Sequence, residues 1–174
     1  MGDSAMTVVA IFLAAILMFV FPLMTMADRK DDTVTLSIQT ETDRYVQEIA
    51  TTGMTTKDAY DNYVQTLAAT GNAYDVDITV QVLDENPSKK ETSATSMIGD
   101  NVYLTKHTTQ VLDELNNNYR NALILKEGDI VTINVKNKNE TIGTQLRNFM
   151  YKVTGNNSST VTATATKMVT TNGQ

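Results

Sequence analysis

The stretch from Ser4 to Ala27, SAMTVVAIFLAAILMFVFPLMTMA, decides what kind of protein this chain can be. It contains no charged side chain; only Asp3 precedes it, and a charged cluster, residues 28–32, follows it. About 20 apolar residues in a helix match the roughly 30 Å hydrocarbon core of a bilayer. The sequence therefore predicts a transmembrane segment within residues 1–30, with membrane lipid as its first partner.

The composition of the remaining chain limits the classes of function. The 174 residues carry a formal net charge of −6 and include no cysteine and one histidine. A mildly acidic domain without a basic patch is a poor nucleic-acid binder, because neutralising phosphates supplies most of that affinity. The absence of cysteine excludes disulfides and thiolate metal sites. About 147 residues remain after the apolar stretch, which is enough for one domain with a core. Because this part is acidic, we expect no nucleic-acid partner.

Three interpretations of the N-terminal stretch remain open. The first is an uncleaved transmembrane helix. The second is a secretory signal peptide cleaved after Ala27, since Thr25 and Ala27 are small and Pro22 could break the helix. Such a peptide normally has a basic start and a shorter apolar run. The third is a pilin-type stem, a helix that begins in the bilayer and later packs into a filament.

A second apolar pattern follows the membrane segment. Val34, Ile38, Tyr45 and Ile49 are separated by four, seven and four residues, which is a helical period. It predicts a stem helix extension over residues 31–53. This stripe could pack against the sheet of the domain or against neighbouring stems. We assign stem and assembly packing to both parts of the stem: Val8, Phe12, Ala15, Phe19, Val34, Ile38, Tyr45 and Ile49.

The residues from 54 to 174 predict an α+β globular domain. Alternating apolar residues over 74–82 indicate a strand with one wet face, and helical spacing over 57–69 indicates an amphipathic helix. Residues 84–101 are polar and predict a mobile loop. The fold class is a long N-terminal stem helix followed by a mainly antiparallel sheet of three to five strands with helices on one face. The other expected elements are strands at 102–104, 122–125, 130–136 and 159–170, and helices at 108–119 and 142–153.

The start of the chain resembles the pilin-like TadE proteins of tight-adherence pili. The shared features are Gly2, the small residues Ser4 and Ala5, the apolar run, and Pro22 about 20 residues in. Those proteins carry a glutamate five residues after the glycine, where this chain has Thr7. The resemblance implies possible processing by a prepilin peptidase after Gly2.

The domain also resembles a group of proteins. Residues 52–55 (TGMT), 69–76 (ATGNAYDV) and 128–137 (GDIVTINVKN) are similar to small membrane-anchored proteins of Firmicutes. Those proteins are encoded with tight-adherence-type pilus or secretion clusters and mobile elements. The resemblance implies a pilin-like architecture and a location in the cell envelope, and it brings no catalytic residue with it.

No residue pattern in the sequence indicates catalysis. His107 is the only histidine, which excludes a histidine metal cluster and predicts a surface residue at a helix start. Asp75 and Asp77 lie two apart on the wet face of a strand, where carboxylates are normally solvated. Phosphate-binding and nucleophile-elbow motifs are absent from the sequence. We therefore assign no catalytic, cofactor-binding or metal-binding residue and expect no cofactor and no enzymatic activity.

The location and function follow from these points as expectations. Arg29 and Lys30 alone would place the C-terminal side in the cytoplasm, whereas the Thr- and Asn-rich composition and the resemblance favour an extracellular domain. We expect a single-pass protein of the bacterial cytoplasmic membrane, present in a surface filament after assembly. The first hypothesis is a pilin-like structural subunit that associates with itself or with related subunits. The second is an envelope accessory protein of a secretion or conjugation system, and the third is an anchored enzyme.

Overall fold

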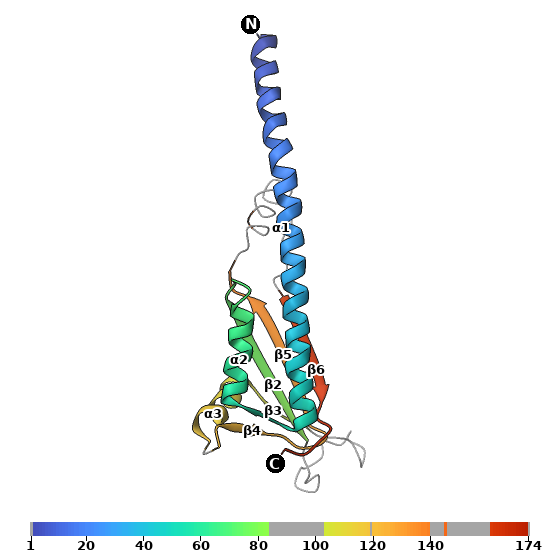
Figure 1. The fold of residues 1–174 in the computed structure, drawn as a ribbon, viewed down its shortest axis with the longest axis vertical. Helices are drawn as coiled ribbons and strands as arrows, with labels where there is room; N and C mark the ends of the chain where they lie inside the picture. Colours follow the sequence, from blue (N-terminus) through green and yellow to red (C-terminus); the bar gives the residue numbers. More distant parts are fainter. Residues whose placement is uncertain (1, 84–102, 119, 140–144, 146–160, 174) are drawn as a thin grey trace, which may run out of the picture. The chain divides into compact units, whose positions relative to one another are not determined.

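A computed structural model describes residues 2–83, 103–118, 120–139, 145 and 161–173 (Figure 1). Residues 2–36 belong to one compact unit. The described residues from Ser37 to Lys138 and from Val161 to Gly173 form a second unit, which we call the domain. The elements are α1 (Gly2–Thr52), β1 (Met54–Thr56), α2 (Lys57–Ala68), β2 (Tyr74–Leu83), β3 (Tyr103–Lys106), α3 (Thr108–Asn117), β4 (Ala122–Ile124), β5 (Ile130–Asn137) and β6 (Val161–Met168).

Helix α1 contains the whole apolar stretch and the predicted extension. It continues through Pro22, although a proline removes one helical hydrogen bond, so the break that Pro22 could cause is not observed. The helix ends at a glycine: Gly53 has a φ of +68°, and its N–H donates to the carbonyl of Ile49 at 2.9 Å. From Ser4 on, α1 is long and apolar enough to cross a membrane, a test that a signal sequence also passes.

The main sheet of the domain has four antiparallel strands in the order β3-β2-β5-β6. Its register aligns Ile78 of β2 with Ile133 of β5, and Ile133 with Ala165 of β6. Strand residues opposite one another point to the same face of the sheet, and all three of these side chains are buried. This is the dry face of the sheet. The inward-facing alanines of β6 leave room for a helix to approach closely.

The opposite face of the sheet is polar. Thr132 and Thr166 are paired across β5 and β6, and their hydroxyls lie 3.0 Å apart. In the next row, the hydroxyl of Thr164 donates to the side-chain oxygen of Asn134 at 2.9 Å. Asp75 and Asp77 of β2 are exposed on this face, as the alternation predicts. One dry face and one wet face are normal for an antiparallel sheet.

Within the domain, residues 37–52 of α1 lie on the same side of the sheet as α2 (Figure 1). Helix α2 begins at the predicted position, where the Thr56 side chain accepts from the N–H of Ala59. It buries Tyr63 and Leu67 on one face. Helix α1 lies along β6, where the Gln39 amide donates to the carbonyl of Thr164 and accepts from its N–H. Gln39 therefore occupies the hydrogen-bonding edge of β6 that a further strand would use.

The C-terminal tail closes the domain by binding three other segments. The N–H of Thr170 donates to the carbonyl of Ala50 at the end of α1, at 2.8 Å. The N–H of Gly173 donates to the carbonyl of Leu125 at 2.9 Å, beyond β4. Gly173 and Gly53 are in such close contact that a Cβ on either residue would lie 2.2 Å from a backbone oxygen. The tail thus holds the junction at Gly53 between the end of α1 and strand β1, which pairs with β4.

Asp129 is the only charged residue among the fully buried positions of the described chain. Its carboxylate accepts from the N–H of Leu83 at 2.8 Å and from the N–H of Lys126 at 2.9 Å. Its own carbonyl accepts from the N–H of Val169 at 2.7 Å. One side chain and its peptide group therefore connect the end of β2, the turn before β5 and the end of β6.

The structure confirms the α+β class, the antiparallel sheet and most of the predicted elements. The compact domain begins at Ser37 and so includes the end of α1. Strand β1, which pairs with β4 from Met54 to Thr56, was not predicted. His107 precedes α3 and is exposed, as expected. The predicted loop at 84–101 and most of the predicted helix at 142–153 lie outside the described residues.

Candidate functional site

The candidate site is the exposed apolar surface of α1 in its first part. Most large apolar side chains between Met6 and Met26 are exposed, from 40% at Leu17 to 77% at Met6, while Val20 and Met24 are half-buried. The consecutive residues Ile11, Phe12 and Leu13 are all exposed. Because successive helical residues point in different directions, this surface is apolar all round and has no polar face. An apolar groove on a single partner would cover only one side of it.

The predicted packing residues divide into two sets. Val8, Phe12, Ala15 and Phe19 are exposed in the first unit, and Val34 is half-buried there. Ile38, Tyr45 and Ile49 lie in the core of the domain, each no more than 4% exposed. These three residues therefore pack inside the domain and offer no surface to a neighbouring stem. The physical reason is that a helical stripe buries itself against whatever apolar surface is nearest, here the dry face of the domain.

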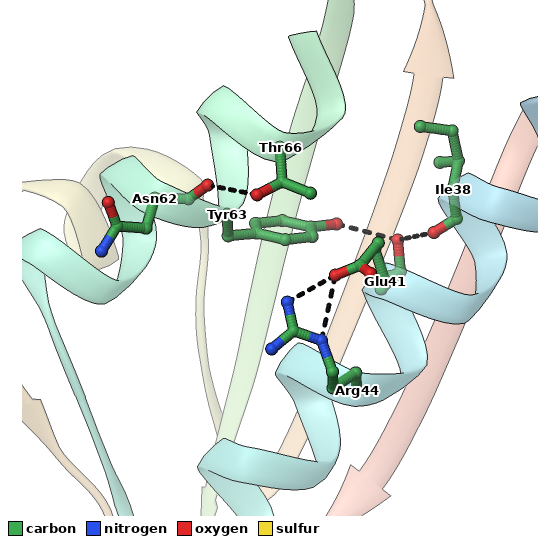
Figure 2. Close-up of polar contacts among 7 residues, drawn as sticks. Ile38, Glu41, Arg44, Asn62, Tyr63 and Thr66 are labelled. Carbon is green, nitrogen blue, oxygen red and sulfur yellow. Dashed lines mark hydrogen bonds and ion pairs between the residues drawn. The ribbon is translucent and has the colours of Figure 1, made fainter. Parts of the chain in front are cut away.

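A polar contact inside the core joins α1 to α2. The Thr42 hydroxyl donates to the carbonyl of Ile38 at 2.7 Å and lies 2.9 Å from the Tyr63 hydroxyl. Since the Thr42 proton is used on Ile38, the Tyr63 hydroxyl is the donor to Thr42. Figure 2 shows Tyr63 extending from α2 toward α1 at this point. The pair lets a buried threonine and a buried tyrosine satisfy each other without water.

A stacked pair of tyrosines extends this contact. The rings of Tyr45 and Tyr63 are 4.4 Å apart and nearly parallel, at 13°. The Tyr45 hydroxyl lies 2.8 Å from the Thr55 hydroxyl of β1. Burial raises the pKa of Tyr63 to about 12 and also raises the pKa of Tyr45. Through the ring stack and the hydroxyl contacts, the two neutral tyrosine side chains connect α1, α2 and β1.

These raised pKa values predict that the domain loses stability at high pH. An unfolded tyrosine ionises near pH 10, and Tyr63 in the domain does so near pH 12. The contribution of neutral, buried Tyr63 to the free energy of unfolding is complete below pH 10. This free energy falls by about 3 kcal/mol as the pH rises from 10 to 12. Urea unfolding at pH 8, 10 and 11 measures the loss. We expect Tyr63→Phe to be less stable than wild type at pH 8 and to lose less stability between pH 8 and 11. An equal loss in both proteins would contradict the assignment.

The outward side of α1 within the domain is polar. Asp43, Arg44, Gln47 and Glu48 are exposed. Arg44 donates from Nε to the Glu41 carboxylate at 3.0 Å (Figure 2), and this hydrogen bond raises the pKa of Arg44. The continuous exposed apolar surface of α1 therefore ends before the charged residues 28–32, and Leu36, which is 68% exposed, is the last large exposed apolar side chain of the helix.

A small groove lies on the wet face of the sheet. Its volume is about 220 Å³, and it is lined by Asp75, Val76, Asp77, Thr108 and Lys136. The Thr108 hydroxyl donates to Asp77 and accepts from the N–H of Ile78, and Asp75 lies 3.4 Å from Lys138. Both carboxylates thus have protein partners. Among the described residues, no group of three or more His, Cys, Asp or Glu could hold a metal ion.

Sequence reasoning missed the polar contacts of the core. Thr42 interrupts the apolar stripe of α1, and a polar residue on a buried stripe was the available signal. Gln39 and Thr55 gave no such signal, because their partners, Thr164 of β6 and Tyr45 of α1, lie in other elements. Searches against family models, curated proteins and solved structures found no match to this chain.

Proposed function

We propose that this chain is a pilin-like structural subunit, anchored by α1 in the bacterial cytoplasmic membrane with its domain outside the cell. The observation that carries the proposal is the uncharged surface of α1 between Ser4 and Ala27, which is apolar on all sides and exposed over most of its length. Such a surface needs lipid around it, or several similar helices. In a filament, the partners are other copies of this chain or related subunits.

The composition of the stem supports contact between helices. Ala5, Ala10, Ala14 and Ala15 are small and would let neighbouring helices approach closely. The charged residues 28–32 and the polar outward side of α1 beyond Leu36 suit water, so the proposal assigns apolar contacts between subunits to residues 4–27. Val8, Phe12, Ala15 and Phe19 are the packing residues that remain for this role.

The domain supports a structural role in a second way. Its buried polar side chains are used within the fold: Asp129 accepts from two backbone N–H groups, and Thr42 binds Tyr63. A domain of this kind presents a folded body on a stem, and its groove on the wet face is smaller than the roughly 300 Å³ at which ligand sites begin.

The N-terminal residue of the mature protein tests the proposal. We expect Met1 in a membrane anchor or Asp3 after pilin-type processing at Gly2. In either case the chain resists alkaline carbonate extraction from membranes and is recovered in fractions sheared from the cell surface. If the first residue were Asp28, the chain would be a secreted domain without α1's apolar surface, and the proposal would fail. A chain that stays monomeric in the membrane would favour an envelope accessory protein instead.

A further inference from the structure

The C-terminal tail contains the only Asn–Gly pair of the sequence, Asn172–Gly173. In such a pair, the glycine nitrogen can lose its proton to water and attack Cγ of the asparagine, because no Cβ on glycine hinders the approach. The bond from Cγ to the side-chain nitrogen breaks, ammonia leaves, and a five-membered succinimide remains. Water then opens the ring at either carbonyl to give aspartate or isoaspartate, with no oxidant or reductant.

Two hydrogen bonds in the domain oppose the first step of this reaction. The N–H of Gly173 donates to the carbonyl of Leu125 at 2.9 Å, so its proton is held. The side-chain oxygen of Asn172 accepts from the N–H of Glu127 at 2.8 Å, so the side chain is held by a partner other than Gly173. Asn172 is nevertheless exposed, and water can reach the pair.

We propose that Asn172–Gly173 is a deamidation site that the folded domain holds inactive and that reacts when the tail opens. The tail carries the N–H of Thr170 that binds the carbonyl of Ala50 at the end of α1, so opening of the tail releases this end of the helix. Deamidation therefore records such an opening as a permanent chemical change.

The two products differ in their effect on the tail. Aspartate keeps the length of the backbone, and its carboxylate can still accept from the N–H of Glu127. Isoaspartate adds a methylene to the main chain between residue 172 and Gly173. The close contact of Gly173 with Gly53, where even a Cβ would lie 2.2 Å from a backbone oxygen, cannot be kept with a longer chain. Isoaspartate therefore prevents the tail from closing again.

Mass spectrometry of the full chain in detergent micelles tests the proposal. Deamidated and isoaspartyl forms of the C-terminal peptide are followed over time, beside a synthetic peptide of residues 167–174 in the same buffer. We expect the folded chain to react at least about tenfold more slowly than the peptide, since the reaction must wait for local opening. Equal rates in the folded chain and the peptide would overturn the proposal.

A matched pair of variants tests the link to opening. Thr170→Val removes a hydroxyl that donates to Ala50 in the tail contact, and Thr66→Val removes one that donates to Asn62 within α2. Thr170→Val should deamidate about fivefold faster than wild type, which is the effect of losing one hydrogen bond, while Thr66→Val should match wild type. Equal rates in the two variants would overturn the proposal.

Amide exchange gives a second measurement: the N–H of Thr170 should exchange slowly in Asn172→Asp and quickly in the isoaspartyl product, and slow exchange in both would overturn it.

Discussion

Replacing Gly53 by alanine is expected to destabilise the domain by about 4 kcal/mol or more, which is exceptional for a single substitution. A Cβ at Gly53 would lie 2.2 Å from the carbonyl oxygen of Thr171 and 2.4 Å from the nitrogen of Gly173. Both are backbone atoms, so relief requires the tail to move and to break its bonds to Ala50 and Leu125. The φ of +68° adds strain for any residue with a side chain.

Urea unfolding followed by circular dichroism measures this effect, and Gly71→Ala is the matched control. Gly71 has a φ of +88°, but a Cβ there would have nothing within 4 Å. Gly71→Ala therefore reports the strain alone, about 1 kcal/mol. Gly173→Ala reports the contact from the other side, because its Cβ would lie 2.2 Å from the carbonyl oxygen of Gly53. If Gly53→Ala cost no more than Gly71→Ala, the close packing of the tail would be refuted.

Replacing Ala15 by arginine is expected to remove most of the chain from the membrane. Ala15 lies near the middle of the uncharged stretch and is exposed. An arginine at the centre of a membrane helix costs about 2.5 to 3.5 kcal/mol, and this corresponds to roughly a hundredfold change in insertion. The fraction of the chain that resists carbonate extraction measures the change.

Gln47→Arg is the control for that experiment. Gln47 lies on the same helix but on its exposed polar side within the domain, where a charge meets water. We expect this variant to fractionate with the wild type. Normal membrane retention of Ala15→Arg would show that the apolar surface of α1 is not in lipid, whereas loss of both variants would point to a general defect in folding.

Periodicity alone predicted the elements whose side chains alternate regularly. The strand at 74–82 and the helix at 57–69 were predicted within a residue or so of β2 and α2, because each buries one face against one layer. Strand β1 has three residues, too few to show a period, and it exists through its pairing with β4, far along the chain. Local sequence does not encode such a distant pairing.

The candidate site was predicted in part for a related reason. The stripe that contains Ile38, Tyr45 and Ile49 has the same spacing whether it faces a sheet of its own domain or a neighbouring stem. The structure places it inside the domain. The uncharged stretch before it needed no such choice, because a helix that is apolar on all sides presents an apolar surface whichever side faces a neighbour.

Cysteine cross-linking between neighbouring stems tests the central claim most directly. The chain has no cysteine of its own, so a single introduced cysteine reports without background. Disulfides form only when two Cα atoms lie within about 4.4 to 6.8 Å. In assembled material, the account predicts dimers for cysteines at positions among Val8, Phe12, Ala15 and Phe19, and monomers for Gln47→Cys. Monomers at all four stem positions, in chains that are otherwise membrane-bound and folded, would contradict it.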